Sequence, residues 1–204
     1  ETIRQYAMEK LVEAGEAIAT RDRHLDFMLG VMEYSPTRMF GTEDLELLNQ
    51  IEAEHDNLRI ALEWATENHP ATALKLAYSA GGFWTIRDYN AEAQFWCITI
   101  LRKTEAMSEL EEDRGRLYGL LGWLMMTLGE HKKGRAASEQ AITLAEKSND
   151  FYTMSRAYAT AGLASCFLGD FPAAFPAIEK AESIAREHDL AAELAFILGS
   201  RAQL

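Results

Sequence analysis

The chain has little of what secreted and membrane proteins carry. Its 204 residues include two cysteines, too few for a disulfide framework. No stretch approaches the roughly 18 uninterrupted apolar residues of a membrane span, and the chain does not open with a basic and apolar secretory leader. We therefore expect a soluble, cytoplasmic protein without a membrane partner, in which Cys97 and Cys166 are inert packing residues within apolar helical stretches.

Basic residues are scarce relative to acidic ones. The 32 Asp and Glu residues oppose 20 Lys and Arg residues, which gives a net charge of −12. Nucleic-acid binding draws most of its affinity from basic side chains that neutralise phosphates, and no basic cluster interleaved with aromatics is present. We expect no direct nucleic-acid binding by this chain, and we interpret the acidic residues as a solvated outer surface.

Motifs that carry catalysis are also missing. The sequence has no glycine-rich loop ending in Gly-Lys-Ser/Thr, no Gly-x-Ser-x-Gly elbow and no His-Glu-x-x-His helix. Glu52, Glu54, His55 and Asp56 form an acidic-histidine cluster. Because adjacent residues of a helix point to different sides, this cluster does not converge on one metal ion. We expect no enzyme activity, no catalytic residue, no metal site and no cofactor.

Hydrophobic periodicity predicts an all-α chain. Only four residues are proline, and nothing alternates with the two-residue period of a strand. Apolar stripes at helical spacing and end signals predict helices over 1–14, 17–34, from the N-cap residue Thr42 to about 68, and over 71–87, 90–106, 111–128, 131–148, 151–168, 171–187 and onward from about 190.

An internal repeat gives the architecture. Residues 116–149 match the segment 40 residues later at nine positions, where composition alone would give roughly two or three. The retained residues are mostly small ones, which let helices approach closely, and a glycine that ends the first helix before its antiparallel partner starts. Stacked helix pairs of this kind form an α-α superhelix. The matched residues of the first copy are Arg116, Tyr118, Gly122, Leu128, Gly129, Ala137, Glu139, Ala141 and Ala145.

The repeats resemble tetratricopeptide repeats, in the longer version found in bacterial regulators. The resemblance rests on Tyr118, Leu121, Gly122 and Ala141, and on their counterparts Tyr158, Ala161, Gly162 and Ala181. Ser138 and Ile178 depart from it, because the repeat usually has a large aromatic residue there.

The N-terminal third resembles the junction of bacterial STAND-class regulators, which are NB-ARC-like signal-transduction ATPases. The matching segments are Glu1–Ala7, Glu9–Leu11, Arg23–His24 and Glu52–Arg59. The resemblance implies that residues 1–14 are the last helix of an upstream winged-helix domain, 15–69 a helical connector, and 70–204 a tetratricopeptide-like array truncated at its C-terminus. It further implies that the upstream ATPase and winged-helix modules of a longer chain are partners of this part.

In the family, the first helix of each pair lines a concave groove that binds a ligand or partner. Carried over to this chain, the groove residues are Trp84, Thr85, Arg116, Trp123, Met126, Thr127, Arg156, Leu163, Cys166 and Phe167. Aromatic and methionine side chains flanked by arginine suit a peptide or an anionic, partly apolar small molecule. The alternative for Trp84 and Phe167 is a core role, as fillers between neighbouring pairs.

Two functions follow as hypotheses. In the first, the array is the non-catalytic sensor of a bacterial signal-transduction ATPase and transcriptional regulator, and it binds a protein or small-molecule effector on its concave face. In the second, it is a passive scaffold for protein docking or self-association. Self-association would use the uncapped helix at 190–204, where Leu194, Phe196, Ile197 and Leu198 lack a following pair.

Overall fold

The computed structural model describes residues 2–34 and 45–201, and within these ranges it contains helices and no strand. This confirms the predicted all-α class. The α-helices are α1 (Thr2–Glu13), α2 (Ala17–Tyr34), α3 (Leu45–Ala53), α4 (His55–Asn68), α5 (Pro70–Ile86), α6 (Asn90–Lys103), α7 (Glu111–Thr127), α8 (His131–Ser148), α9 (Phe151–Phe167), α10 (Phe171–Glu187) and α11 (Ala191–Arg201), with a 3₁₀ turn at Ser108–Leu110 before α7.

The predicted helix boundaries hold to within one residue except in two segments. Helix α6, predicted to reach residue 106, ends at Lys103. Helices α2, α8 and α10 have the predicted bounds. The helix predicted to run unbroken to residue 68 is interrupted at Glu54, whose φ of −95° and ψ of 6° leave the helical region. The break lets Ile51 of α3 and Leu58 of α4 both reach the core, where each is 0% exposed. The predicted N-cap Thr42 lies outside the described residues.

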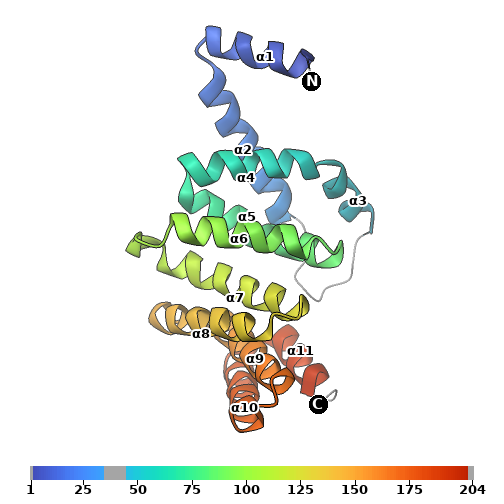
Figure 1. Cartoon of the computed structure of the whole chain (residues 1–204), viewed down its shortest axis with the longest axis vertical. Coiled ribbons are helices and arrows are strands. Elements are labelled where there is room, and N and C mark those ends of the chain that lie inside the picture. The colour runs from blue at the N-terminus through green and yellow to red at the C-terminus, as the bar shows by residue number, and fades with distance from the viewer. Residues whose placement is uncertain (1, 35–44, 202–204) are drawn as a thin grey trace.

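From α5 onward the helices form antiparallel pairs that stack into an α-α superhelix of the tetratricopeptide-like kind (Figure 1). The pairs are α5 with α6, α7 with α8, and α9 with α10. The first helices of successive pairs, α5, α7, α9 and α11, contact one another in turn, and the second helices lie on the other side of the stack. We call α5, α7, α9 and α11 the first helices.

Small residues set the spacing within each pair, as the repeat predicts. A Cβ built on Gly122 of α7 would lie 2.4 Å from the Ser138 hydroxyl oxygen of α8, and one on Gly162 of α9 would lie 2.6 Å from a side-chain carbon of Ile178 in α10. Neither position has room for a side chain. The turns between these helices pass through Gly129 and Gly169, at φ values of +77° and +76°, which glycine adopts without steric cost.

The expected connector packs directly on the array. Helices α2 and α4 contact each other and α5. Leu25 and Met28 of α2, Leu62 of α4 and Leu74 of α5 belong to one apolar core that continues to Ala137 in α8. A second, smaller core joins α9, α10 and α11. The domain division at residue 70 therefore stays a prediction, because one apolar core crosses it.

Ion pairs connect α4 to α6, and α8 to the start of α10. Arg59 of α4 bonds Glu92 of α6, with 3.0 Å between Nε and Oε1, and Arg135 of α8 bonds Asp170 before α10, with 3.0 Å between Nη1 and Oδ2. His55 also lies 3.0 Å from Glu92. Although burial raises the pKa of Glu92, the hydrogen bond from Arg59 and the attraction of His55 hold it below its usual value.

Gly122→Ala should lower the free energy of unfolding by about 1–3 kcal/mol, because the added methyl group forces α7 away from α8. Gly30→Ala is the matched control, since a Cβ there meets nothing within 4 Å, and it should stabilise helix α2 by about 0.5–1 kcal/mol. Urea denaturation of both variants measures the difference. Equal effects would show that the close contact at Gly122 does not set the helix spacing.

Glu92→Gln should lower the free energy of unfolding at pH 7 by about 1 kcal/mol, a modest value because Arg59 is 44% exposed. A carboxyl group whose pKa is lowered by folding stabilises the protein above its unfolded pKa of about 4.3, and that stability disappears as the pH falls through the lower folded pKa. The variant should therefore show a shallower loss of stability below about pH 4.3. Glu139→Gln, at a side chain that is 60% exposed, is the control that should keep the wild-type profile in acid unfolding monitored by circular dichroism.

Candidate functional site

The first helices form the concave side of the stack. The ring of Trp123 in α7 meets the ring of Phe196 in α11, with centroids 5.4 Å apart and planes at 76°. These helices are two pairs apart, so their contact requires the stack to curve toward this side. We call this side the inner face. It brings together eight side chains from four first helices and one turn, Tyr78, Arg116, Trp123, Asp150, Tyr152, Arg156, Glu193 and Phe196.

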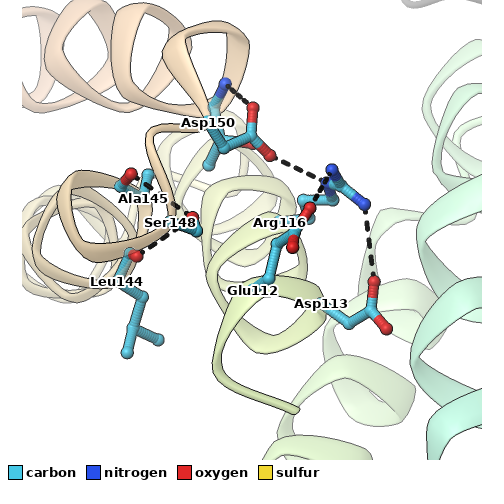
Figure 2. A network of polar contacts seen from close by, with 8 residues as sticks. Glu112, Asp113, Arg116, Leu144, Ala145, Ser148 and Asp150 are labelled. Atoms are coloured by element: carbon cyan, nitrogen blue, oxygen red, sulfur yellow. Dashed lines mark hydrogen bonds and ion pairs between the residues drawn. The ribbon is translucent and has the colours of Figure 1, made fainter. Parts of the chain in front are cut away.

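Arg116 on α7 is surrounded by three carboxylates (Figure 2). Its Nε donates to Asp150 at 2.8 Å, its Nη2 to Glu112 at 2.6 Å and its Nη1 to Asp113 at 3.5 Å. Burial alone would lower the pKa of Arg116, but the hydrogen bond and charge of Asp150 raise it above its usual value. The guanidinium thus stays charged and joins α7 to the start of α9.

Asp150 has a second role as the N-cap of α9. Its Oδ1 accepts a hydrogen bond from the backbone N–H of Thr153 at 3.1 Å, which satisfies one of the unpaired donors at the helix start. Its other oxygen accepts from Arg116. One carboxylate therefore fixes both the helix end and the junction between two pairs.

Arg156 on α9 is buried between two aromatic rings and a carboxylate. Glu193 of α11 accepts hydrogen bonds from its Nε and Nη2, and the two side chains are 6% and 1% exposed. The guanidinium carbon lies 4.7 Å from the ring centroid of Phe196 and 5.8 Å from that of Tyr152. This combination of a bidentate ion pair and cation–π contacts fixes the orientation of the guanidinium.

Two phenols complete the inner face. Burial raises the pKa of Tyr78, and the carboxylate of Asp150 adds to the effect. Burial likewise raises the pKa of Tyr152, against the opposing charge of Arg156. The Tyr152 hydroxyl hydrogen-bonds Glu193, whereas the side chain of Tyr78 is 36% exposed.

The ten predicted groove residues differ in how exposed their side chains are. Thr127 and Phe167 are exposed, Thr85, Arg116, Trp123 and Cys166 are partly buried, and Trp84, Met126, Arg156 and Leu163 are buried. Arg116, Trp123 and Thr127 share one stripe of α7 by helical spacing. Of the ten, Arg116, Trp123 and Arg156 take part in the contacts that hold the inner face together.

Four of these placements correct the prediction. Met126 and Leu163 are buried and do not line an open groove, and the same holds for Trp84 and Arg156. Trp84 does not line a groove: its side chain is 0% exposed and belongs to the main apolar core, which is the core role left open for it. Arg156 is not open to a ligand, because Glu193 and the two rings already cover it. Phe167 is 63% exposed and stacks on His131, with centroids 4.6 Å apart, so it is not a core filler.

Sequence reasoning did not assign Tyr78, Asp150, Tyr152, Glu193 or Phe196 to the inner face, and it named Phe196 only as part of the helix expected to self-associate. One signal could have found Phe196. It lies one 40-residue period after Arg156 and two after Arg116, so extending the repeat into α11 places it on the inner face. Glu193 is one helical turn before it on the same side.

A separate cleft of about 500 Å³ lies among α1, α2 and α4. The guanidinium of Arg21 lies over the ring of Trp64 at 4.8 Å. Trp64 donates to Asp22 at 2.9 Å, and the hydrogen bonds from Trp64 and His69 lower the pKa of this carboxyl group. The cleft is lined by Leu11, Ala17, Thr20, Arg21, His24, Ile60, Glu63, Trp64, Glu67 and Asn68. No sequence motif pointed to it.

The acidic-histidine segment is dispersed among different partners. His55 pairs with Glu92, Glu52 accepts from Tyr89, and Glu54 accepts from Asn57 at 2.7 Å. Across residues 2–34 and 45–201, no three His, Cys, Asp or Glu side chains are placed to hold a metal ion, and no helix there is long and apolar enough to cross a membrane. Cys97 and Cys166 are free thiols whose pKa is raised by burial, which disfavours the reactive thiolate.

The curated proteins to which this chain is similar carry the names of transcriptional regulators. No family model matches the chain. Over 196 residues, or 93% of the chain, it is 30% identical to proteins named as HTH-type transcriptional regulators in Mycobacterium bovis and Mycobacterium tuberculosis. The chain spans 22% of the length of these relatives.

The fold is also found in a solved structure. The crystal structure of the apo form of RapI superposes with a TM-score of 0.63 at 14% sequence identity, and the match covers 92% of this chain and 69% of that one. At this identity the likeness shows the fold, an all-α superhelix.

Asp150→Ala should destabilise the chain by about 2 kcal/mol, because it removes the cap of α9 and takes from Arg116 the most buried of its three carboxylates. Asp170→Ala is the matched control. Asp170 also precedes a helix and pairs with an arginine, but it is 43% exposed and makes no capping bond, so its loss should be below about 1 kcal/mol. Thermal unfolding compares the two variants. A similar cost at both positions would contradict the double role of Asp150.

Proposed function

We propose that this chain is a protein-interaction and sensor region of a bacterial transcriptional regulator, and that it binds its effector on the inner face. The similarity to HTH-type regulators covers 93% of the chain, which supports a regulatory role. The observation that carries the sensor role is the meeting of aromatic and charged side chains from α5, α7, α9 and α11 on one concave side. An effector held there contacts several helix pairs at once.

The proposed effector is a protein segment or a small molecule with an apolar ring. Trp123 and Phe167 offer ring surfaces on this side or at its rim, and Phe167 is 63% exposed. Tyr78, which is 36% exposed, supplies a hydroxyl group. We propose no catalytic step, because no described set of acid, base and nucleophile converges here.

The regulator we propose is of the STAND class. In this reading the relatives' remaining length holds the ATPase and winged-helix modules, and this chain follows them in the cytoplasm. Binding of the effector changes how the connector, α2 to α4, holds those modules. Such coupling requires an effector that binds the active and inactive forms unequally. This region has 32 acidic and 20 basic residues, and DNA binding relies on basic side chains. We therefore do not propose it as the DNA-binding part of the regulator.

A passive scaffold is the second candidate, and one observation favours it. Phe171 and Phe175, on the outer side of α10, are 53% and 52% exposed and stack with centroids 6.2 Å apart. Exposed aromatic pairs of this kind mark docking surfaces more often than isolated apolar residues do. A scaffold would bind here, or through Leu198 of α11, which is 42% exposed, without any change in the inner face.

Native mass spectrometry of the chain mixed with host-cell extract separates the two functions. We expect a bound species that Trp123→Ala retains at least about tenfold less than wild type, because its ring forms part of the inner face. Phe171→Ala, the matched ring deletion on the outer side, should retain it fully. Loss with Phe171→Ala alone would favour the scaffold. Circular dichroism confirms that both variants stay folded.

A further inference from the structure

The cleft among α1, α2 and α4 is separate from the inner face and takes no part in the function proposed above. Figure 1 shows α2 running from α1 to the level of α4. The cleft volume of about 500 Å³ lies within the range of small-molecule sites. By helical spacing, one wall is Ala17, Thr20, Arg21 and His24 of α2, and the facing wall is Ile60, Glu63, Trp64 and Glu67 of α4.

The indole ring of Trp64 is held in one orientation at this wall. Its Nε1 donates to Oδ1 of Asp22 at 2.9 Å, and Nε2 of His69 lies 2.8 Å from the same oxygen. The guanidinium of Arg21 lies over the ring, 4.8 Å from its centroid. A ring fixed in this way offers an apolar surface that needs no rearrangement before a ligand binds.

Two opposite charges lie next to this ring. Arg21 is exposed, and its stacking on Trp64 uses the face of the guanidinium, whereas the N–H donors point outward from its edges. Glu63 is also exposed, and it forms no ion pair with any residue that the structure describes. Glu67, one turn further along α4, is instead paired with Lys103 at 2.7 Å. The cleft therefore offers one cation and one carboxylate beside an aromatic wall.

This pair of charges selects the chemistry of a ligand. A ligand with a single charge would cover the opposite group without pairing it, and removing water from an unpaired charge is costly. A ligand that carries both an ammonium and a carboxylate group pairs with Glu63 and Arg21 together. Its remaining part meets the apolar side chains of Trp64, Leu11 and Ile60. A free amino acid with an apolar side chain has these three features.

We propose that the cleft binds a free amino acid with a large apolar side chain. Its carboxylate pairs with Arg21, its ammonium group with Glu63, and its side chain packs against Trp64. The proposal goes beyond the function proposed above, because it adds a small-molecule site on the connector that is independent of the inner face. A ligand in the cleft contacts α1, α2 and α4 at once, so its binding stabilises their arrangement.

Thermal unfolding of the whole 204-residue chain, with each standard L-amino acid added in turn at about 10 mM, gives the first test. At least one amino acid with an apolar side chain should raise the melting temperature. Isothermal titration then compares the amino acid that gives the largest shift with its decarboxylated amine and its deaminated acid. Each analogue lacks one charge and should bind at least about tenfold more weakly.

Two variants assign the charges. Arg21→Gln should bind the amino acid and the amine equally, because the partner of the carboxylate is gone. Glu63→Gln should bind the amino acid and the deaminated acid equally, for the corresponding reason. Arg23→Gln is the matched control, since Arg23 is exposed on the same helix but does not line the cleft, and it should keep wild-type affinity. Circular dichroism checks that the variants stay folded.

The proposal is overturned if no amino acid raises the melting temperature, or if the amine or the deaminated acid binds wild type as tightly as the amino acid. Wild-type affinity in both folded variants, Arg21→Gln and Glu63→Gln, would also overturn it. Trp123→Ala should bind the amino acid as wild type does, and a loss there would assign the binding to the inner face instead. The extract experiment with Trp123→Ala does not involve the cleft, so failure of this inference leaves the function proposed for the inner face standing.

Discussion

The architecture depends on how closely the two helices of each pair approach. At Gly122 and Gly162 the neighbouring helix occupies the space that a side chain would need, so the paired axes come nearer than ordinary side chains permit. This approach is repeated at the 40-residue period, and repetition of one small rotation gives a curved stack. The curvature in turn brings Trp123 and Phe196 together across an intervening pair. The curvature that forms the inner face thus depends on Gly122 and Gly162, which are not part of that face.

The arginines of the inner face connect successive first helices. Arg116 joins α7 to the cap of α9, and Arg156 joins α9 to α11. In a chain with a net charge of −12, carboxylates are abundant and arginine side chains on this face are already paired. These arginines therefore hold the helices of the array together.

Much of the fold could be predicted from the sequence, because local signals and the repeat agree. Helix periodicity, turn glycines and the 40-residue spacing gave the all-α superhelix and most helix ends. The break at Glu54 could not be predicted, because no proline or glycine marks it. It is visible only in the structure, where Ile51 before it and Leu58 after it are both fully buried. The candidate site was harder to predict than the fold. The position of Trp84 in its helix placed it on a candidate surface, but the packing of other helices buries it. The partner of Arg156, Glu193, lies 37 residues away in the sequence, so helical spacing does not reveal the pair.

The buried apolar side chains form two clusters. From α2 to α8, buried side chains run from Leu25 to Ala137 without a gap, whereas the α9–α11 end has its own small cluster around Ile178 and Ala181. Figure 1 shows this end at the opposite pole of the long axis from α1. A densely packed body transmits displacement with little compression. Because α2 to α8 share one packed cluster, a change of angle between α8 and α9 would move α2 to α8 together, as one unit, relative to α10 and α11.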